Sequence, residues 1–301
     1  MAFQTLKELV LAAGNGRIAD AMRRMEHEES GQSATEIDER MQRHFAVMEQ
    51  SVRTGLARPR VSRGGLIGGD AERLARYSQA PSGVLGPVAL NAMTYAMAVS
   101  EVNAAMGQIV ATPTAGSAGI LPGVLVAVLD SGRFDRKQVI DSLFTAAAVG
   151  LVIANSASIS GAAGGCQAEV GSATAMAAAA VAELSGGSPQ QAVEAVGLAL
   201  TNSLGLVCDP VAGLVEVPCL YRNGLHAVTA LAVAECVLAG IQGVIPPDEV
   251  VGAMYDVGNH LPLSLRETGL GGLAATPTGN RLRIQIFGGS PPDEPDAGIR
   301  G

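Results

Sequence analysis

Three cysteines have glycine or proline as neighbours, in segments that can turn a sulfur atom inward. Cys166 lies in SGAAGGCQAEVG, Cys208 in LVCDPVAG and Cys219 in VEVPCLYRNG. The gaps of 42 and 11 residues between them match neither a CxxC zinc pair nor the compact ferredoxin run. This spacing is compatible with buried free cysteines, or with loops that turn thiolates toward one bulky cofactor. Cys236, in the middle of ALAVAECVLAGI, has no such setting, and we assign it to the core.

A second candidate is the segment TPTAGSAG, residues 112–119, which precedes the apolar run ILPGVLVAVL. If that run is a helix, backbone amides and hydroxyls converge at its N-terminus, where a carboxylate is stabilised. Thr112, Thr114 and Ser117 supply hydroxyl groups, and Gly116 lets a ligand approach the backbone closely. A helix cap with a turn before it explains the same spacing. Both interpretations predict a loop that ends where a helix begins.

The charged residues argue against several classes of protein. The chain has two lysines, Lys7 and Lys137, and both lie in charged contexts at predicted helix starts. A pyridoxal phosphate enzyme needs a buried lysine for its Schiff base, so this cofactor is not expected. The formal net charge of −8 argues against nucleic acid and anionic membrane surfaces as partners. We therefore expect an enzyme that acts on a small molecule.

The cysteine count and the first residues indicate a reducing compartment. Four cysteines in 301 residues cannot form a disulfide scaffold, and MAFQTLKELV lacks the pattern of a signal peptide. We expect reduced thiols and a cytoplasmic location. Residues 142–168 carry no charge and could span a bilayer by length. Their Asn, Ser, Gly and Ala content favours a buried helix plus a loop, and we expect no membrane association.

The composition predicts a mainly α fold. Hydrophobic residues make up 48% of the chain, aromatics only 3%, and there are 38 glycines and no tryptophan. A core of Ala, Val, Leu, Met and Gly favours closely packed helices over aromatic-rich strands. We predict a single helical catalytic domain with Gly-rich loops over residues 61–288, preceded by a polar helical arm over residues 1–60. The Pro- and Asp-rich residues 289–301 are predicted to be a flexible tail.

The predicted arm has two stretches of helical pattern, TLKELVLAAGNGRIADAMRRMEHEES and TEIDERMQRHFAVMEQSVRTGL. The second begins near Ser33, where a small hydroxyl residue precedes several glutamates. We interpret the arm as amphipathic helices that pack on the domain or on a partner. Past the arm, the 84 positions between Lys137 and Arg222 contain no basic residue. Such a segment must be mostly interior, so its few acidic residues are candidates for a site: Asp141, Glu169, Glu183, Glu194, Asp209 and Glu216.

Longer motifs carry a family resemblance. The segments GLIGGDAERLARY, NAAMGQIVATPTAGSAGILPG, SISGAAGGCQAEVGSATAMAAAA, LGLVCDPVAGLVEVPC with the following RNG, and GLGGLAATPTG occur in this order. Together they resemble the alpha chain of bacterial iron–sulfur-dependent L-serine dehydratase. Two positions depart from the pattern of many relatives, since His226 stands where glycine is common and GSAG replaces GSCG at 116–119.

The resemblance implies a [4Fe–4S] cluster bound by Cys166, Cys208 and Cys219. It implies that L-serine is dehydrated to aminoacrylate, which hydrolyses to pyruvate and ammonia. An iron without a protein ligand would act as a Lewis acid on the serine hydroxyl. The resemblance also implies a separate beta chain, in a heterodimer or a larger assembly. We expect the substrate to be bound by the 112–119 loop and further polar contacts: Thr112, Thr114, Gly116, Ser117, Asn103, Ser62 and Arg222.

Several alternatives remain at this stage. The same cluster chemistry would suit an L-cysteine desulfidase or an L-threonine dehydratase, and a non-catalytic Cys-containing binding subunit belongs to a different class. We assign no general base, since the partner chain could supply it. Candidates within the chain are the histidines and acidic residues that are equally suited to helix caps and ion pairs: His27, His44, His226, His260, Glu101, Glu169, Asp209 and Glu216.

Overall fold

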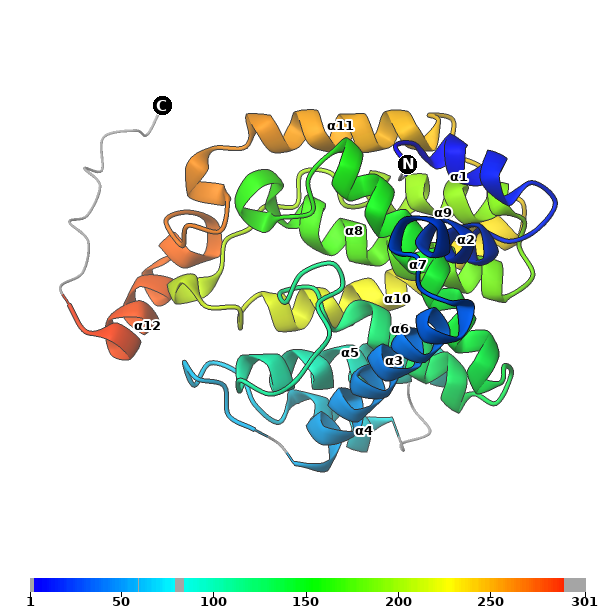
Figure 1. Cartoon of the computed structure of the whole chain (residues 1–301). Helices are drawn as coiled ribbons and strands as arrows, with labels where there is room; N and C mark the ends of the chain where they lie inside the picture. Colours follow the sequence, from blue (N-terminus) through cyan, green and yellow to red (C-terminus); the bar gives the residue numbers. More distant parts are fainter. Residues whose placement is uncertain (1–2, 59, 79–83, 290–301) are drawn as a thin grey trace.

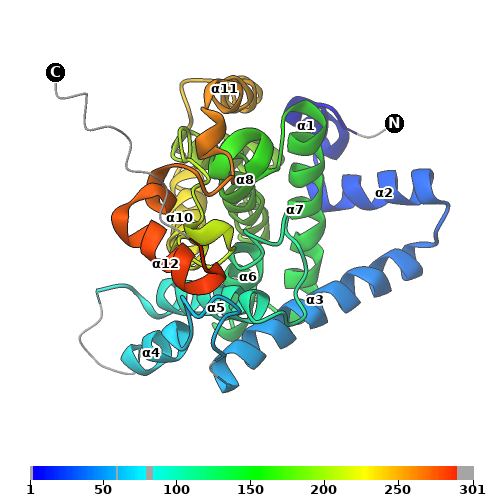
Figure 2. The ribbon, with the colours of Figure 1, turned by 90° about the vertical axis from the view of Figure 1, so that its left-hand side faces the viewer.

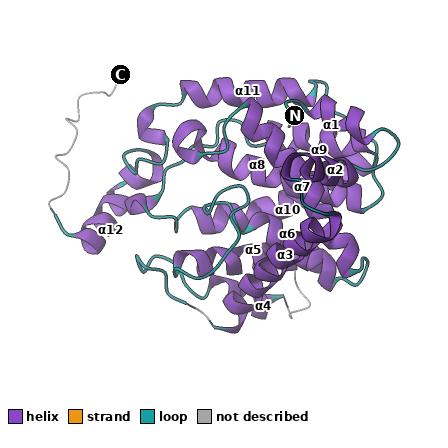
Figure 3. Ribbon diagram, in the orientation of Figure 1, coloured by secondary structure: helices purple, strands orange, loops and turns teal. Residues whose placement is uncertain are grey.

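The computed structural model describes residues 3–58, 60–78 and 84–289. Over these residues it contains twelve α-helices, three short 3-10 helices and no strand, which confirms the predicted mainly α class (Figures 1 and 3). Nearly all of the predicted tail, residues 290–301, lies outside the described residues. The helices are α1 (Leu6–Ala13), α2 (Ile18–Ser30), α3 (Ala34–Ala57), α4 (Asp70–Tyr77), α5 (Pro87–Ala104), α6 (Ile120–Asp130), α7 (Arg136–Ser156), α8 (Gly161–Leu184), α9 (Pro189–Thr201), η1 (Val211–Gly213), α10 (Cys219–Leu238), α11 (Pro247–His260), η2 (Leu263–Leu265), η3 (Gly272–Ala275) and α12 (Pro277–Phe287).

Helix α8 is the centre of the molecule. It packs against α6, α7, α9, α10 and α11, and every residue from Gly164 to Glu183 is buried. Its sequence explains this position, because a run of alanines and glycines has few side-chain atoms to hold neighbouring helices apart. Close approach is also seen between α6 and α5, where a Cβ atom on Gly123 would lie 2.6 Å from the backbone nitrogen of Ala96. Small residues therefore set the helix spacing that the composition predicted.

Helix α7 accounts for most of the uncharged stretch. It is the one helix of the described chain that is long and apolar enough to cross a membrane, but 72% of its most apolar window is buried inside the protein. It packs against α2 and α8, and only residues 157–160 separate it from α8. The predicted buried helix is confirmed, and the following loop is shorter than expected because α8 begins at Gly161.

The N-terminal arm consists of three helices. The first stretch of helical pattern is divided into α1 and α2, because Gly14 has a φ of 56° and ends α1. Helix α3 begins with a capping box in which Ser33 and Glu36 bond each other's backbone amides, which confirms the predicted start. Figure 2 shows α2 and α3 meeting at an angle beside α7.

Two carboxylates outside the arm, on α11 and α8, accept hydrogen bonds from the N-termini of the arm helices α1 and α2. The amide of Leu6 donates to Asp248 Oδ1 of α11 at 2.7 Å. The amides of Ile18 and Ala19 donate to the two carboxylate oxygens of Glu183, at 2.6 and 3.2 Å. Glu183 is buried near the end of α8, and the amides at the start of α2 stabilise its carboxylate. The arm is thereby fixed to the central helix.

We expect Glu183→Gln to lower the free energy of unfolding by about 1–3 kcal/mol, because the neutral glutamine amide has one acceptor oxygen for the two backbone N–H groups and turns an NH2 group toward the other. Urea denaturation measures this difference. The matched control is Glu28→Gln, since Glu28 is exposed on α2, the arm helix whose N-terminus Glu183 holds. The control should stay within about 0.5 kcal/mol of the unmodified chain. Equal stabilities for the two variants would contradict the anchoring role.

Candidate active site

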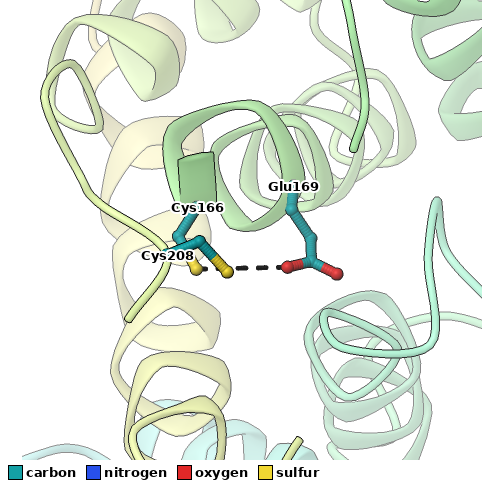
Figure 4. Close-up of side chains that lie close together, drawn as sticks. All are labelled: Cys166, Glu169 and Cys208. Atoms are coloured by element: carbon teal, nitrogen blue, oxygen red, sulfur yellow. Dashed lines mark hydrogen bonds between the residues drawn. The ribbon is translucent and has the colours of Figure 1, made fainter. Parts of the chain in front are cut away.

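Two cysteines and a glutamate converge in the interior. The sulfur atoms of Cys166 and Cys208 and a carboxylate oxygen of Glu169 all lie within 4.8 Å of one another. All three residues are buried, and Figure 4 shows their functional atoms turned toward one another. Cys166 and Glu169 come from the same face of α8, while Cys208 comes from the segment between α9 and η1.

The local structure around two of the cysteines differs from the predicted loops. Cys166 lies within α8, directly after Gly165, whose φ of 75° and ψ of 179° interrupt the helix. Cys219 is the first residue of α10. The predicted loop setting is therefore wrong for Cys166 and Cys219. A break in the helix at Gly165 orients the sulfur of Cys166, and the start of α10 orients that of Cys219, so neither needs a loop. Only Cys208 lies in an irregular segment.

Cys236 has the helical setting that the sequence predicts, in the middle of α10. It is only partly buried, so its assignment to the core is wrong in degree. The helix presents it at the edge of the packed region rather than inside it, and it is not part of the group formed by Cys166, Glu169 and Cys208.

The backbone of Cys208 is fixed by a segment that follows α11. The Cys208 amide donates to the carbonyl of Leu265 at 2.9 Å, and the amide of Glu267 donates to the Cys208 carbonyl at 2.7 Å. These bonds form an isolated parallel bridge between Cys208 and Arg266. Glu267 has a φ of 61°, an uncommon conformation for a residue with a side chain. The position of the Cys208 thiol thus depends on residues 265–267.

Arg222 supplies the positive charge at the thiols. Its Nη1 lies 3.3 Å from the Cys166 sulfur and donates to the Val207 carbonyl at 2.8 Å, while Nη2 donates to Asp209 Oδ1 at 2.9 Å. A hydrogen bond from Cys208 and the charge of Arg222 lower the pKa of Cys166 against the effect of burial. The same hydrogen bond and burial raise the pKa of Cys208. Cys166 is therefore the thiol that most readily becomes a thiolate.

Cys219 belongs to the same electrostatic environment. It is buried at the start of α10, three residues before Arg222. Burial, followed by the negative charge that Cys166 carries as a thiolate, raises the pKa of Cys219. A bound cation would reverse this effect on Cys208 and Cys219, since coordination stabilises thiolates.

The 112–119 loop binds a carboxylate, as its composition predicts, but the carboxylate belongs to Glu169. Thr114 Oγ1 donates a short hydrogen bond to Glu169 Oε1, and the amide of Gly116 donates to the same carboxylate. A Cβ atom on Gly116 would lie 2.5 Å from Glu169 Oε1, so only glycine permits this approach. Burial raises the pKa of Glu169, against the hydrogen bond from Thr114.

The remaining loop residues have internal roles. Ser117 is fully buried, with its hydroxyl 3.1 Å from Thr114 Oγ1 and 3.3 Å from the Thr112 carbonyl. Thr112 is buried, and its hydroxyl has no hydrogen-bond partner among the described residues. Asn103 donates to the carbonyl of Ala115 at 3.0 Å. These contacts hold the shape of the loop around Thr114 and Gly116.

Ser62 lies in a separate turn that Glu216 holds together. Its hydroxyl donates to Glu216 Oε2 at 2.6 Å, and the amide of Gly64 donates to Glu216 Oε1 at 2.6 Å. Ser62 also accepts from the amide of Ile67 at 3.2 Å. The structure gives this hydroxyl a complete set of protein partners, and it brings Ser62 to the residues just before Cys219.

Sequence reasoning missed Asn223 and Glu267. Asn223 is buried on α10, accepts from the amide of Gly119 at 2.9 Å, and donates to the carbonyl of Gly116 at 2.7 Å. It therefore ties the carboxylate-binding loop to the helix that begins at Cys219. Asn223 is the middle residue of the RNG motif, and this motif was the sequence signal that could have identified it as a site residue. Glu267 lies two residues before the GLGGLAATPTG motif, so its proximity to Cys208 had no local signal.

Comparison with known proteins identifies the family of the chain. A family model described as serine dehydratase alpha chain matches residues 14–274. The chain belongs to the serine dehydratase alpha chain family. The matched range includes most of the three-helix arm together with the region that carries Cys166, Cys208 and Cys219.

Curated members of the family are similar over most of their length. The chain is 52% identical over 290 residues to the probable L-serine dehydratase, alpha chain, of Bacillus subtilis (strain 168), which covers 96% of both chains. It is 43% identical over 267 residues to the L-serine dehydratase, alpha chain, of Peptoniphilus asaccharolyticus, covering 89% of this chain and 91% of that relative. The L-serine dehydratase of Streptomyces coelicolor is 38% identical over 276 residues, covering 90% of this chain and 60% of that relative.

His226, one of the histidines singled out in the sequence, is a partly buried residue of α10 beside the site. It lies one helical turn beyond Arg222 on α10, and its Nδ1 is 3.0 Å from Thr174 Oγ1 of α8. Burial and the charge of Arg222 lower the pKa of His226 to about 4. The imidazole therefore bridges α8 and α10 without adding charge at neutral pH.

This pKa makes stability depend on pH. The unfolded chain binds a proton at His226 below its ordinary pKa of about 6.5, whereas the folded chain does so only near pH 4. The contribution of neutral His226 to the free energy of unfolding is thus constant above pH 6.5 and is lost as the pH falls from 6.5 to 4. We expect the unmodified chain to lose roughly 3 kcal/mol more than His226→Gln over this range in urea titrations. His260→Gln, at the exposed end of α11, should lose as much as the unmodified chain, and parallel curves for all three proteins would contradict the assignment.

Proposed function

We propose that this chain is the catalytic alpha chain of an L-serine dehydratase, which converts L-serine to pyruvate and ammonia. The observation that carries the proposal is the meeting of the buried thiols of Cys166 and Cys208 with the carboxylate-binding loop at Glu169. The names of the most similar relatives support the substrate. The reaction removes the Cα proton and the β-hydroxyl as water, and the resulting aminoacrylate takes up water to give pyruvate and ammonia.

We infer that Cys166, Cys208 and Cys219 hold a [4Fe–4S] cluster. Three observations support the fit: all three thiols are buried, Arg222 favours the thiolate at Cys166, and soft sulfur donors suit iron–sulfur clusters. Glycine at position 161 leaves space beside the thiols, since a Cβ there would lie only 3.0 Å from the Cys208 sulfur. When bound, the cluster would supply a Lewis acid for the departing hydroxyl.

The 112–119 loop is proposed to bind the substrate carboxylate. The Thr114 hydroxyl and the Gly116 amide already hold a carboxylate, that of Glu169, which supports their suitability for this group. We expect the carboxylate of serine to replace that of Glu169 at these donors. Ser117 and Asn103 would keep the loop in shape through their bonds to Thr114 and Ala115. Arg222 would balance the negative charge of the thiolates instead of contacting the substrate directly.

A separate beta chain is proposed as the partner. Two of the most similar relatives are named as alpha chains, whereas the Streptomyces coelicolor relative, named without a chain designation, is matched over only 60% of its length. We therefore expect the active enzyme to contain this chain together with a beta chain, and to work in the cytoplasm, where thiols stay reduced.

The cysteine assignment has a direct test. We expect anaerobically purified protein, co-expressed with a beta chain, to be brown, to contain about four irons per alpha chain and to deaminate L-serine. Cys166→Ala, Cys208→Ala and Cys219→Ala should each abolish the visible absorbance and the activity. Cys236→Ala is the control and should retain both, since Cys236 lies away from the thiol group. Loss of iron from the control, or a colourless chain that holds zinc, would refute the cluster. Faster turnover of L-cysteine or L-threonine would reassign the substrate.

The carboxylate-binding loop is tested by Thr114→Val, which removes one donor and conserves volume. A charge-assisted hydrogen bond is worth about 1.5 to 3 kcal/mol, so the KM for L-serine should rise roughly tenfold to a hundredfold. The cluster absorbance should be unchanged. Thr229→Val on α10, whose hydroxyl bonds only the carbonyl of Leu225, is the control and should behave like the unmodified enzyme. An unchanged KM in Thr114→Val would leave the loop with the structural role of a helix cap.

A further inference from the structure

Three carboxylates surround the thiols, and two of them are already engaged. Glu169 accepts from Thr114 and Gly116. Asp209 accepts from Arg222 Nη2 at 2.9 Å and from the amide of Leu273 at 2.8 Å. The carboxylate of the third, Glu267, has no hydrogen bond and no ion pair with any described residue. Of these three carboxylates it is therefore the one that no donor of the described chain occupies before a ligand binds.

Glu267 is also exposed, in contrast to Glu169 and Asp209, which are buried. Its backbone is nevertheless held in place, because its amide donates to the Cys208 carbonyl at 2.7 Å. An exposed carboxylate on a fixed backbone can meet a ligand that enters from solvent, and it needs no large movement to do so.

The side chain of Glu267 reaches the space beside the thiols. The position that a Cβ atom on Gly161 would occupy lies 3.3 Å from Glu267 Oε2, 3.1 Å from Glu169 Oε2 and 3.0 Å from the Cys208 sulfur. A thiol and two carboxylates thus border one small space, which glycine leaves open. Glu267 is the exposed one of the two carboxylates that border it.

The substrate has a group to which the proposed function assigns no binding residue. L-Serine carries a carboxylate, a β-hydroxyl and a positively charged α-ammonium group. In the proposed function, the loop takes the carboxylate, and a cluster held by the thiols would supply a Lewis acid for the hydroxyl. Arg222 repels an ammonium group, and Asp209 is held by Arg222 and by the amide of Leu273. Glu169, once the substrate has replaced it at the loop, stays buried beside the thiols, whereas Glu267 is exposed and faces a ligand that enters from solvent.

We propose that Glu267 binds the α-ammonium group of the substrate, and so selects amino acids over hydroxy acids of the same shape. This inference rests on the proposed function and names a further substrate-binding residue within it. A carboxylate and an ammonium form a charge-assisted pair, whereas a ligand without the ammonium leaves Glu267 in water, where it loses nothing. The Glu267 side chain alone would thus distinguish amino acids from hydroxy acids of the same shape.

The test compares L-serine with 3-hydroxypropanoate, which is serine without the ammonium group. In the complete anaerobic enzyme, Glu267→Gln should raise the KM for L-serine about tenfold to a hundredfold. The binding constant of 3-hydroxypropanoate, measured by calorimetry and as an inhibitor, should stay within about twofold or become tighter. The visible absorbance of the cluster should not change. Glu249→Gln, an exposed residue in the first turn of α11, is the matched control and should leave both constants unchanged.

Each other outcome has a defined meaning. Equal weakening of both ligands in Glu267→Gln would overturn the inference, since it indicates a structural role of the 265–267 segment. An unchanged KM for L-serine would overturn it as well. Failure of the unmodified enzyme to deaminate L-serine would instead refute the proposed function, and this measurement is made first.

Discussion

The site depends on one buried balance of charge. Arg222 lies between the sulfur of Cys166 and the carboxylate of Asp209, and it reaches both. Removing one member of such a group leaves an uncompensated charge in the interior, which is strongly destabilising. The central helix α8, the helix α10 and the segment that carries Cys208 and Asp209 are therefore constrained to one relative arrangement. The carboxylate-binding loop joins them through Asn223 of α10.

The sequence predicted the fold class and the interior position of the charge-poor region, because both follow from composition. Of its acidic residues, Asp141, Glu169, Glu183, Asp209 and Glu216 are buried. Their individual roles were not predictable, since each partner is distant along the chain. Asp141 and Glu183 hold the arm, Glu216 holds the turn at Ser62, and only two acidic residues of the region lie at the thiols.

The candidate site was predictable in its residue types and less so in its geometry. Donors ahead of α6 predicted a bound carboxylate, but no local pattern specifies that Glu169, 55 residues from Thr114, supplies it. The break at Gly165 was hidden for a related reason, because glycine occurs within helices and in left-handed conformations alike. Glycine near Cys166 correctly predicted a turn of the chain. The need for glycine at 165 comes from distant residues, because a Cβ atom there would lie 2.6 Å from Leu261 Cδ1 and 3.0 Å from the carbonyl oxygen of Leu206.

The bonds between Cys208 and the 265–267 segment bear on how the protein is made. A ribosome synthesises Cys208 well before Leu265 and Glu267, whose backbone groups hold it. A nascent chain that has released α8 and Cys208 therefore has its thiols but not their final arrangement. The group formed by Cys166, Glu169 and Cys208 is completed only after the segment following α11 has emerged. The Cys208 thiol is consequently fixed late in the synthesis of the chain, and a chain that terminated within α11 would lack the backbone groups that hold it.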